Sequence, residues 1–395
     1  TIDYTPMNMN PMVNAASVAD GENVKTETDF ALNHRNYGGK PDIGAIENTT
    51  QPENGTTYFV RTPETGGDDT HDGLSWATAF ATIGHALDKA KTGKKSVWVA
   101  QGVYYENLTM QDGVNVYGGF KSYGNPGMRE GERDISNLDS TYQTIIDGQF
   151  KGHVLNQEGN FSNATTWEGL TIQNGTNLNP YSTGSVSTIT ETKTNTGSSD
   201  WSEGTYGTKV TKTITRTFTS QYRLNYNRWW WKTVLQYGGG AYILKNATLK
   251  NCLIRYNHYF QSYPSYITVK VAPTTTFTTT TITKASADAK EVSVTKDSVS
   301  NVPYMTYETP SSGTVFGKDM EKGGSGIYLG SGAVLENCVV RNNEGKIYNN
   351  TNKMVGCGIL SDGGTVLNSL IVENYTSGGN CLGVAMYLKT KSFIY

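Results

Sequence analysis

The sequence has little of several features that would place it quickly in a known class of protein. It contains four cysteines and five histidines, without a CxxC pair or a Cys/His spacing of the kind that binds zinc. No apolar run approaches the about 20 residues that a membrane-spanning helix needs. The net charge of −2 provides no overall field for nucleic acid or an anionic membrane. We therefore expect neither a nucleic-acid partner nor a direct membrane span.

Glycine and tyrosine are abundant instead, with 44 and 25 residues, and the chain contains a repeated sequence. Each copy consists of a small-residue turn, a short apolar strand, a second turn, a second apolar strand and an asparagine corner. Copies begin at Gly239, Ser325 and Cys357, and a fourth is entered at Val384–Leu388. Because one such unit cannot bury its apolar face alone, neighbouring copies must stack on one another. The repeat predicts an all-β fold, a parallel β-solenoid.

Alignment of the copies predicts which residues stack. In the second strand apolar residues recur at every second position, as in a strand with one buried face. One inward column is expected to hold Leu170, Cys252, Cys338 and Leu370. Asparagine tolerates the left-handed backbone of a tight corner. One corner column is therefore expected to hold Asn257, Asn343 and Tyr375. A second corner column is expected to hold the small residues Gly240, Gly326, Gly358 and Ala385.

The spacing of the copies indicates two long insertions, at about residues 176–236 and 258–322. Loops longer than about 15 residues are uncommon unless they are structured or functional, so specific function is expected there. Both insertions are rich in threonine, with alternating β-branched residues in segments such as Thr208–Thr219. This pattern predicts two Thr-rich β-hairpins.

The N-terminal part suggests a domain boundary. Residues 1–50 are interpreted as the closing segment of a preceding β-helix domain, residues 51–56 as a linker and residues 57–395 as the next domain. A helix is predicted at about 77–91, where Phe80, Ile83, Leu87 and Ala90 recur at helical spacing, and it would cap the solenoid. The apparent strand at the other end of the sequence suggests that the solenoid continues or is covered by a partner.

Several segments carry a family resemblance: Pro41–Glu47 after Arg35, Gly73–Phe80, Val97–Tyr104 and Val116–Phe120. They resemble the closing motif and the first coils of choice-of-anchor Q type surface proteins, whose repeats are related in pattern to polymorphic outer-membrane adhesins. The resemblance covers most of the chain outside the insertions. It implies a right-handed, pectin-lyase-like parallel β-helix, exported and exposed at the surface of anaerobic Gram-negative bacteria in association with the outer membrane. It implies no reaction.

The candidate ligand-binding residues lie in the first insertion, and they are Tyr226, Trp229, Trp230 and Trp231. In a strand, Trp229 and Trp231 share one face. Two interpretations remain open. The tryptophans seal the arm onto the β-helix by burying a large area, or they form an exposed platform for a sugar or a protein.

Catalytic and metal-binding signals are weak. A glycoside hydrolase needs two carboxylates about 5–10 Å apart, and the nearest sequence cluster is Arg133, Asp134, Asp139, Asp147 and His153. The simpler interpretation of Asp147 is that it forms an Asp-Gly turn. No second coil provides the other carboxylate that hydrolysis would need. The segment Gly66–Gly73 has oxygen ligands for Ca²⁺ but lacks the register of an EF-hand, which favours a solvated turn. Pairing of Cys357 with Cys381 is left open.

The sequence thus predicts a protein without catalytic residues and without a required cofactor. We expect an exported cell-surface β-helix protein that serves adhesion, glycan binding or protein binding. A polysaccharide lyase or glycoside hydrolase of the same fold is one alternative. A structural fibre or surface-layer subunit, formed by self-assembly, is the other.

Overall fold

The computed structural model describes residues 57–93, 96–121, 133, 135, 143–178, 180, 182–183, 191–196, 207–218, 220–225, 237–264, 266–272, 274–284, 290, 292–300, 304–308, 313–315, 322–347 and 353–394. The proposed closing segment 1–50 and the linker 51–56 lie outside these residues. The chain divides into two compact units. Unit 1 comprises Thr1–Asn179, Trp231–Ser262 and Val315–Tyr395, and unit 2 comprises Pro180–Trp230 and Tyr263–Thr314.

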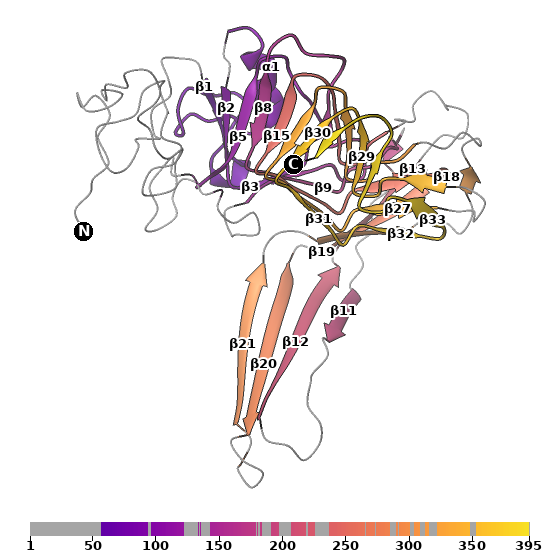
Figure 1. Ribbon diagram of the computed structural model, residues 1–395. Helices are drawn as coiled ribbons and strands as arrows, with labels where there is room; N and C mark the ends of the chain where they lie inside the picture. The colour runs from indigo at the N-terminus through magenta and orange to yellow at the C-terminus, as the bar shows by residue number, and fades with distance from the viewer. Residues whose placement is uncertain are drawn as a thin grey trace, which may run out of the picture. The chain divides into compact units, whose positions relative to one another are not determined.

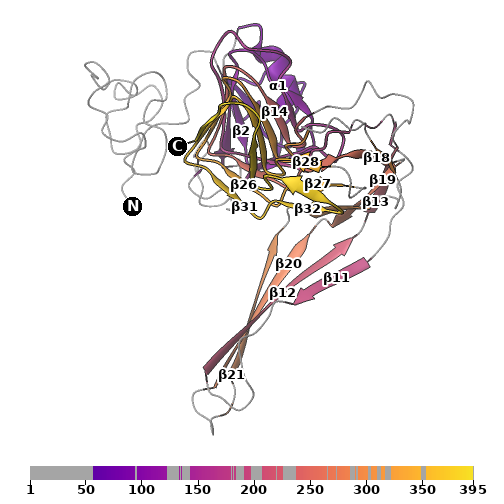
Figure 2. The ribbon, with the colours of Figure 1, turned by 45° about the vertical axis from the view of Figure 1, so that its right-hand side comes forward.

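Parallel sheets make up the described part of unit 1, and three of them are large (Figures 1 and 2). Sheet 1 contains β1 (Thr57–Val60), β2 (Ser96–Ala100), β5 (Asn115–Phe120), β8 (Thr165–Glu168), β15 (Ala247–Lys250), β25 (Val334–Glu336), β30 (Thr365–Leu367) and β35 (Phe393–Ile394). Sheet 2 contains β3 (Gly102–Tyr104), β6 (Thr144–Asp147), β9 (Leu170–Gln173), β16 (Leu253–Arg255), β26 (Val339–Arg341) and β31 (Leu370–Val372). Sheet 3 contains β4 (Leu108–Thr109), β7 (Leu155–Asn156), β14 (Ala241–Ile243), β24 (Ile327–Gly330), β29 (Ile359–Asp362) and β34 (Met386–Leu388).

From β2 onward the chain passes through these sheets in a constant order, sheet 1, then sheet 2, then sheet 3, and back to sheet 1. Smaller parallel sheets follow sheet 2 in the later passages. They consist of β17 (His258–Phe260), β27 (Glu344–Lys346) and β32 (Tyr375–Ser377), and of β28 (Lys353–Val355) and β33 (Asn380–Leu382). Each strand pairs with its counterpart from the neighbouring passage. The prediction of an all-β fold with parallel sheets is confirmed.

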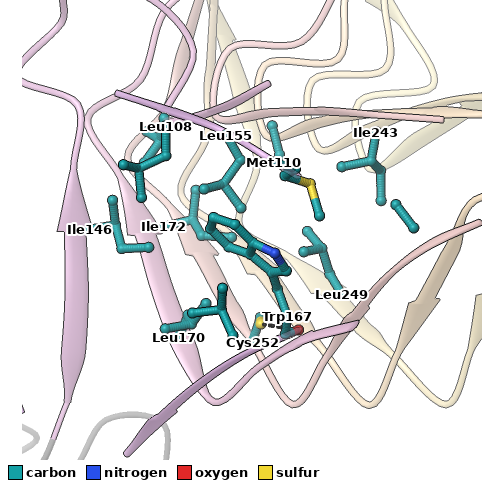
Figure 3. Close-up of a cluster of buried hydrophobic side chains, with 14 of the residues drawn as sticks. Leu108, Met110, Ile146, Leu155, Trp167, Leu170, Ile172, Ile243, Leu249 and Cys252 are labelled. Carbon is teal, nitrogen blue, oxygen red and sulfur yellow. Dashed lines mark hydrogen bonds between the residues drawn. The ribbon is translucent and has the colours of Figure 1, made fainter. Parts of the chain in front are cut away.

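The core of unit 1 lies between the sheets. Alternate residues of many strands point into it, and Trp167 at its centre is fully buried. Figure 3 shows the Trp167 ring surrounded by aliphatic side chains from all three large sheets, among them Leu170, Leu249 and Ile243. Glycine or asparagine takes a positive φ at many of the turns, including Asn251 and Asn337, where a left-handed backbone suits these residue types.

The register of the strands corrects one predicted column. The Cys252 amide donates to Cys338 Sγ over 3.4 Å, and the Cys338 amide donates to Ser369 Oγ over 3.1 Å. Leu370 pairs instead with Val339 and is 55% exposed. The prediction for Leu370 was therefore wrong by one residue. The run Leu-Ile-Val is apolar at every position, so the alternation that would set its phase is absent.

The asparagine corner is present, with a corrected third member. Asn343 Oδ1 accepts hydrogen bonds from the amide and the Nδ2 of Asn257, both over 3.0 Å. Asn374 Oδ1 accepts the equivalent bonds from Asn343, over 3.1 and 2.9 Å. Tyr375, the predicted member, is 46% exposed. The positive φ belongs to the preceding residue in each copy, as at Tyr256 and Asn342, so these asparagines act through their side chains.

The predicted helix is shorter than expected. Helix α1 spans Ile83–Ala90, with Thr82 as its N-cap, and the predicted stretch was about 77–91. Phe80 has the right spacing for the helical face, but it forms a parallel β-bridge with Val60 and belongs to the extended chain. Ile83, Leu87 and the other buried residues of α1 join the core of unit 1. A 3-10 turn, η2 (Pro63–Thr65), precedes this region.

Unit 2 consists mainly of two four-stranded antiparallel sheets. One contains β10 (Ser182–Thr183), β13 (Ser220–Asn225), β19 (Tyr266–Ala272) and β22 (Tyr304–Glu308). The other contains β11 (Glu191–Thr196), β12 (Gly207–Phe218), β20 (Thr275–Lys284) and β21 (Val292–Ser300). A two-stranded sheet joins β18 (Ser262–Pro264) to β23 (Gly313–Val315). Because β12 pairs with β20 and β13 with β19, the two predicted insertions share both four-stranded sheets.

Candidate functional site

The sequence-predicted binding residues Tyr226, Trp229, Trp230 and Trp231 lie outside the described residues. Their two interpretations therefore remain predictions. Asp134 and Asp139 of the weak catalytic cluster also lie outside them.

The described members of that cluster have separate partners. Arg133 forms a buried ion pair with Glu168, with 3.1 Å between Nη1 and Oε2. Asp147 Oδ2 accepts hydrogen bonds from Gln173 Nε2 (2.9 Å) and Asn174 Nδ2 (2.7 Å). Burial raises the pKa of Asp147, and these hydrogen bonds oppose that shift. Asp147 is thus a partner in a buried hydrogen-bond network.

The aspartates of Gly66–Gly73 organise the local backbone. Asp69 Oδ1 accepts from the amides of Ala81 and Thr82, at 2.9 and 3.0 Å, next to the start of α1. Hydrogen bonds from their neighbours lower the pKa of Asp68 and of Asp72. Over the residues that the structure describes, no group of three or more His, Cys, Asp or Glu side chains is arranged to hold a metal ion. No helix in this part of the chain is both long and apolar enough to span a membrane.

A row of tyrosines on sheet 3 was not predicted. Ala241 and Ile243 of β14 belong to the core, so Tyr242 between them lies on the opposite face. The strand register then places one residue of each strand in a single column: Asn156, Tyr242, Tyr328, Leu360 and Tyr387. We give the name tyrosine ladder to four residues: Tyr242, Tyr328 and Tyr387 of this column, and Tyr237, which precedes β14.

Strand spacing sets the ring geometry of the ladder. Tyr242 and Tyr328 stack with 4.9 Å between ring centroids and 10° between planes, close to the about 4.8 Å between neighbouring strands. Tyr237 stacks on Tyr328 at 4.8 Å, and the His153 ring lies 5.9 Å from Tyr242. Tyr328 is 8% exposed, whereas Tyr237, Tyr242 and Tyr387 are half-buried. Three of the four tyrosines are therefore partly accessible to solvent.

A polar group adjoins the ladder. Asp362 Oδ2 accepts a hydrogen bond from Tyr328 Oη (3.2 Å) and lies 3.5 Å from Lys389 Nζ. Thr390 Oγ1 donates to Asp362 Oδ1 over 2.9 Å, and Lys389 Nζ lies 5.7 Å from the Tyr237 ring centroid. A carboxylate, an ammonium and phenol hydroxyls thus occur beside stacked aromatic rings.

Burial raises the pKa of Tyr242 and of Tyr328, and the Asp362 carboxylate adds to the shift at Tyr328. Both hydroxyls stay protonated at neutral pH. The Tyr328 hydroxyl donates its hydrogen to Asp362, and the Tyr242 hydroxyl can donate to a ligand. Such a surface can bind a ligand that has hydroxyl groups and apolar edges.

The sequence contained a signal for the ladder. Tyr242, Tyr328 and Tyr387 each occupy the middle of a short apolar strand after the column of glycines or alanine. The third copy has Leu360 at this position, so the pattern is incomplete. Tyr237 and His153 come from turns, and only the folded chain brings them to the row.

His153 gives a testable pH dependence. Burial lowers the pKa of its imidazole from 6.5 to about 4. Between these values the unfolded chain binds a proton that the folded chain does not, so the free energy of unfolding falls as the pH is lowered from about 6.5 towards 4. We expect a loss of about 3 kcal/mol over this window, measured by urea unfolding at several pH values.

The control is the variant His153→Gln, followed over the same pH range. Carboxyls with a raised pKa, such as Asp147, change stability in the opposite direction, so the difference between the two proteins isolates the histidine. Parallel stability curves for the two proteins would contradict the assignment.

Comparisons with known proteins add no further assignment. No protein-family model, no curated protein and no solved structure matches the chain.

Proposed function

We propose that unit 1 is a right-handed parallel β-helix of the pectin-lyase-like kind. The constant order of sheets supports this, because a chain that returns to each sheet one strand further along describes a helix. Parallel strands joined by crossovers are nearly always connected with right-handed geometry. Helix α1 would then cap its first passages. The family resemblance of Gly73–Phe80 and Val116–Phe120 supports export and display on a cell surface.

We further propose that the protein binds a glycan without chemical conversion, as an adhesin or surface-binding protein. The tyrosine ladder is the observation that carries this proposal. Tyr242 and Tyr328 lie on neighbouring strands, and Tyr387 lies two strands further on, after Leu360, so the surface extends along the stacking direction. An extended polysaccharide offers the matching chemistry, with hydroxyls for Asp362 and the phenols and apolar edges for the rings.

Two buried carboxylates of unit 1, Asp147 and Glu344, are occupied by structural contacts, which favours a binding function over hydrolysis. Asp147 is fully buried and accepts three hydrogen bonds, from Gln149, Gln173 and Asn174. Glu344 is 7% exposed and contacts His258 Nδ1 at 3.3 Å and the hydroxyls of Tyr375 and Ser377. Both carboxylates have structural partners, whereas hydrolysis needs an acid and a base open to substrate.

The test is retention of the full chain on a panel of immobilised polysaccharides, with chain length of each polysaccharide followed in parallel. Retention without shortening is expected. The variants Tyr242→Ala and Tyr387→Ala should each weaken binding about tenfold, as truncation of an aromatic contact does at interfaces. Tyr105→Ala is the matched control, because Tyr105 is 45% exposed and follows β3, outside the ladder.

Three results would overturn the proposal. Shortened polysaccharide would identify a lyase or hydrolase. Equal binding by the ladder variants and Tyr105→Ala would move the site to another surface, with Trp229 and Trp231 as the next candidates. No retention, together with a particle size that grows with concentration, would favour a fibre or surface-layer subunit.

A further inference from the structure

Two cysteine side chains meet at the small sheet formed by β28 and β33. Cys381 lies in β33 opposite Met354 of β28, and Cys357 follows β28. The Cys357 thiol donates to Cys381, with 2.9 Å between the two Sγ atoms. For comparison, the Sγ atoms of Cys252 and Cys338 lie 3.2–3.6 Å from the carbonyl oxygens that accept from them. The sulfur atoms of Cys357 and Cys381 are therefore closer together than these sulfur–oxygen pairs, although sulfur is larger than oxygen. All four cysteines are free thiols in the structure.

The surroundings give the two thiols different roles. Cys357 is fully buried among Tyr259, Ile347 and Met354, whereas Cys381 is partly exposed. The hydrogen bond from Cys357 lowers the pKa of Cys381, and together with burial it raises the pKa of Cys357. The accessible sulfur is therefore the one that forms a thiolate more readily, and the thiolate is the nucleophile in thiol–disulfide exchange.

We propose that Cys357 and Cys381 form a redox-active pair of thiols that gives up two electrons to a disulfide oxidant. Cys381 is the attacking cysteine and Cys357 the resolving one. The product is an intramolecular disulfide that links the turn before β29 to β33. This inference does not depend on the proposed glycan binding.

The reaction balances as two exchanges. The Cys381 thiolate attacks one sulfur of the oxidant, the oxidant S–S bond breaks, and a mixed disulfide and one thiolate are formed. The Cys357 thiol then loses its proton and attacks the Cys381 sulfur, which releases the second oxidant thiolate. The two protons of the cysteines end on the two released thiols. The cysteine pair is oxidised by two electrons, and the oxidant disulfide is reduced by two.

The disulfide would restrain a part of unit 1 that has much exposed apolar surface. It closes a loop between positions 24 residues apart. Directly after that loop, Leu382, Val384 and Leu388 are 46%, 37% and 43% exposed. A cross-link reduces the freedom of the open state of such a segment, so oxidation is expected to slow its cleavage by a protease.

The test uses the reduced full chain and oxidised glutathione at mildly alkaline pH. We expect the thiol count after denaturation to fall from four to two, with a mass loss of two hydrogens, no glutathione adduct and a peptide cross-link between Cys357 and Cys381. Cleavage by trypsin at Lys389 and Lys391 should become several-fold slower. The variant Cys357→Ser should instead accumulate one glutathione adduct at Cys381.

The matched control is Cys252→Ser, which removes a fully buried thiol and should leave the cross-link unchanged. Four thiols that persist after oxidation of the wild-type chain would overturn the proposal. A cross-link that involves Cys338, or a Cys357→Ser variant without an adduct, would do the same. Unchanged trypsin cleavage after cross-linking would refute the restraining role.

Discussion

Replacement of Arg133 with methionine is expected to lower the free energy of unfolding by about 3–5 kcal/mol. Arg133 and Glu168 form an ion pair in which both side chains are only 2% exposed. Arg133 also donates from Nε to the Gly118 carbonyl over 2.8 Å. Removal of the guanidinium leaves the Glu168 carboxylate buried without its cation, while Asn251 Nδ2 still donates to Oε1 over 2.7 Å. Calorimetric or denaturant unfolding measures the loss.

A double variant separates the charge from the packing. Arg133→Met combined with Glu168→Gln removes both charges and keeps an oxygen for Asn251. We expect it to recover at least half of the lost stability, because the cost of breaking a buried pair comes mainly from the uncompensated charge. A single variant within about 1 kcal/mol of the wild type, or a double variant less stable than the single one, would contradict this account.

Replacement of Asn343 with alanine is expected to destabilise unit 1 by about 3–5 kcal/mol. Asn343 is fully buried. Its Oδ1 accepts two hydrogen bonds from Asn257, and its Nδ2 donates to the Ile254 carbonyl (3.0 Å) and to Asn374 (2.9 Å). Truncation leaves these four groups without this partner. Asn257 and Ile254 are fully buried, and each unsatisfied buried group costs about 1–3 kcal/mol.

The control for this prediction is Asn337→Gly. Asn337 has a φ of 52° and is half-buried, and glycine adopts this backbone without strain, so a loss below about 1 kcal/mol is expected. Amide hydrogen exchange gives a local test, because the Asn257 amide donates to Asn343 Oδ1 and should lose protection in Asn343→Ala. Equal effects of the two substitutions would show that the corner contributes no special stability.

The repeat pattern determined more of this fold than any single motif did. The columns of Asn257 with Asn343, and of Gly240, Gly326 and Gly358, were predicted from the sequence, and the structure confirms them. Gly326, for instance, has the Gly358 carbonyl so close that a Cβ would lie 2.5 Å from its oxygen. Such positions are visible in a sequence because each repeat must place a small or amide-bearing residue at the same turn.

The errors occurred where the local pattern is ambiguous. Leu370 was misplaced because its strand is apolar at every position, and only pairing with β26 sets the register. Phe80 fits the helical face of α1, but its backbone pairs with Val60, which lies far from it in sequence. In both cases a pairing between distant residues decided the outcome, and a local window contains no information about that pairing.

The sequence by itself determined that the chain is an all-β protein of stacked repeats, because periodic apolar strands and small turn residues are local properties. Only the tertiary structure decided which side chains meet: Arg133 with Glu168, Cys357 with Cys381, and the tyrosines of sheet 3 with one another. These contacts join residues from different passages of the chain. The tyrosines meet because parallel strands about 4.8 Å apart bring equivalent positions together. Arg133 and Cys357 lie outside the named strands, so the path of the chain between strands brings them to their partners.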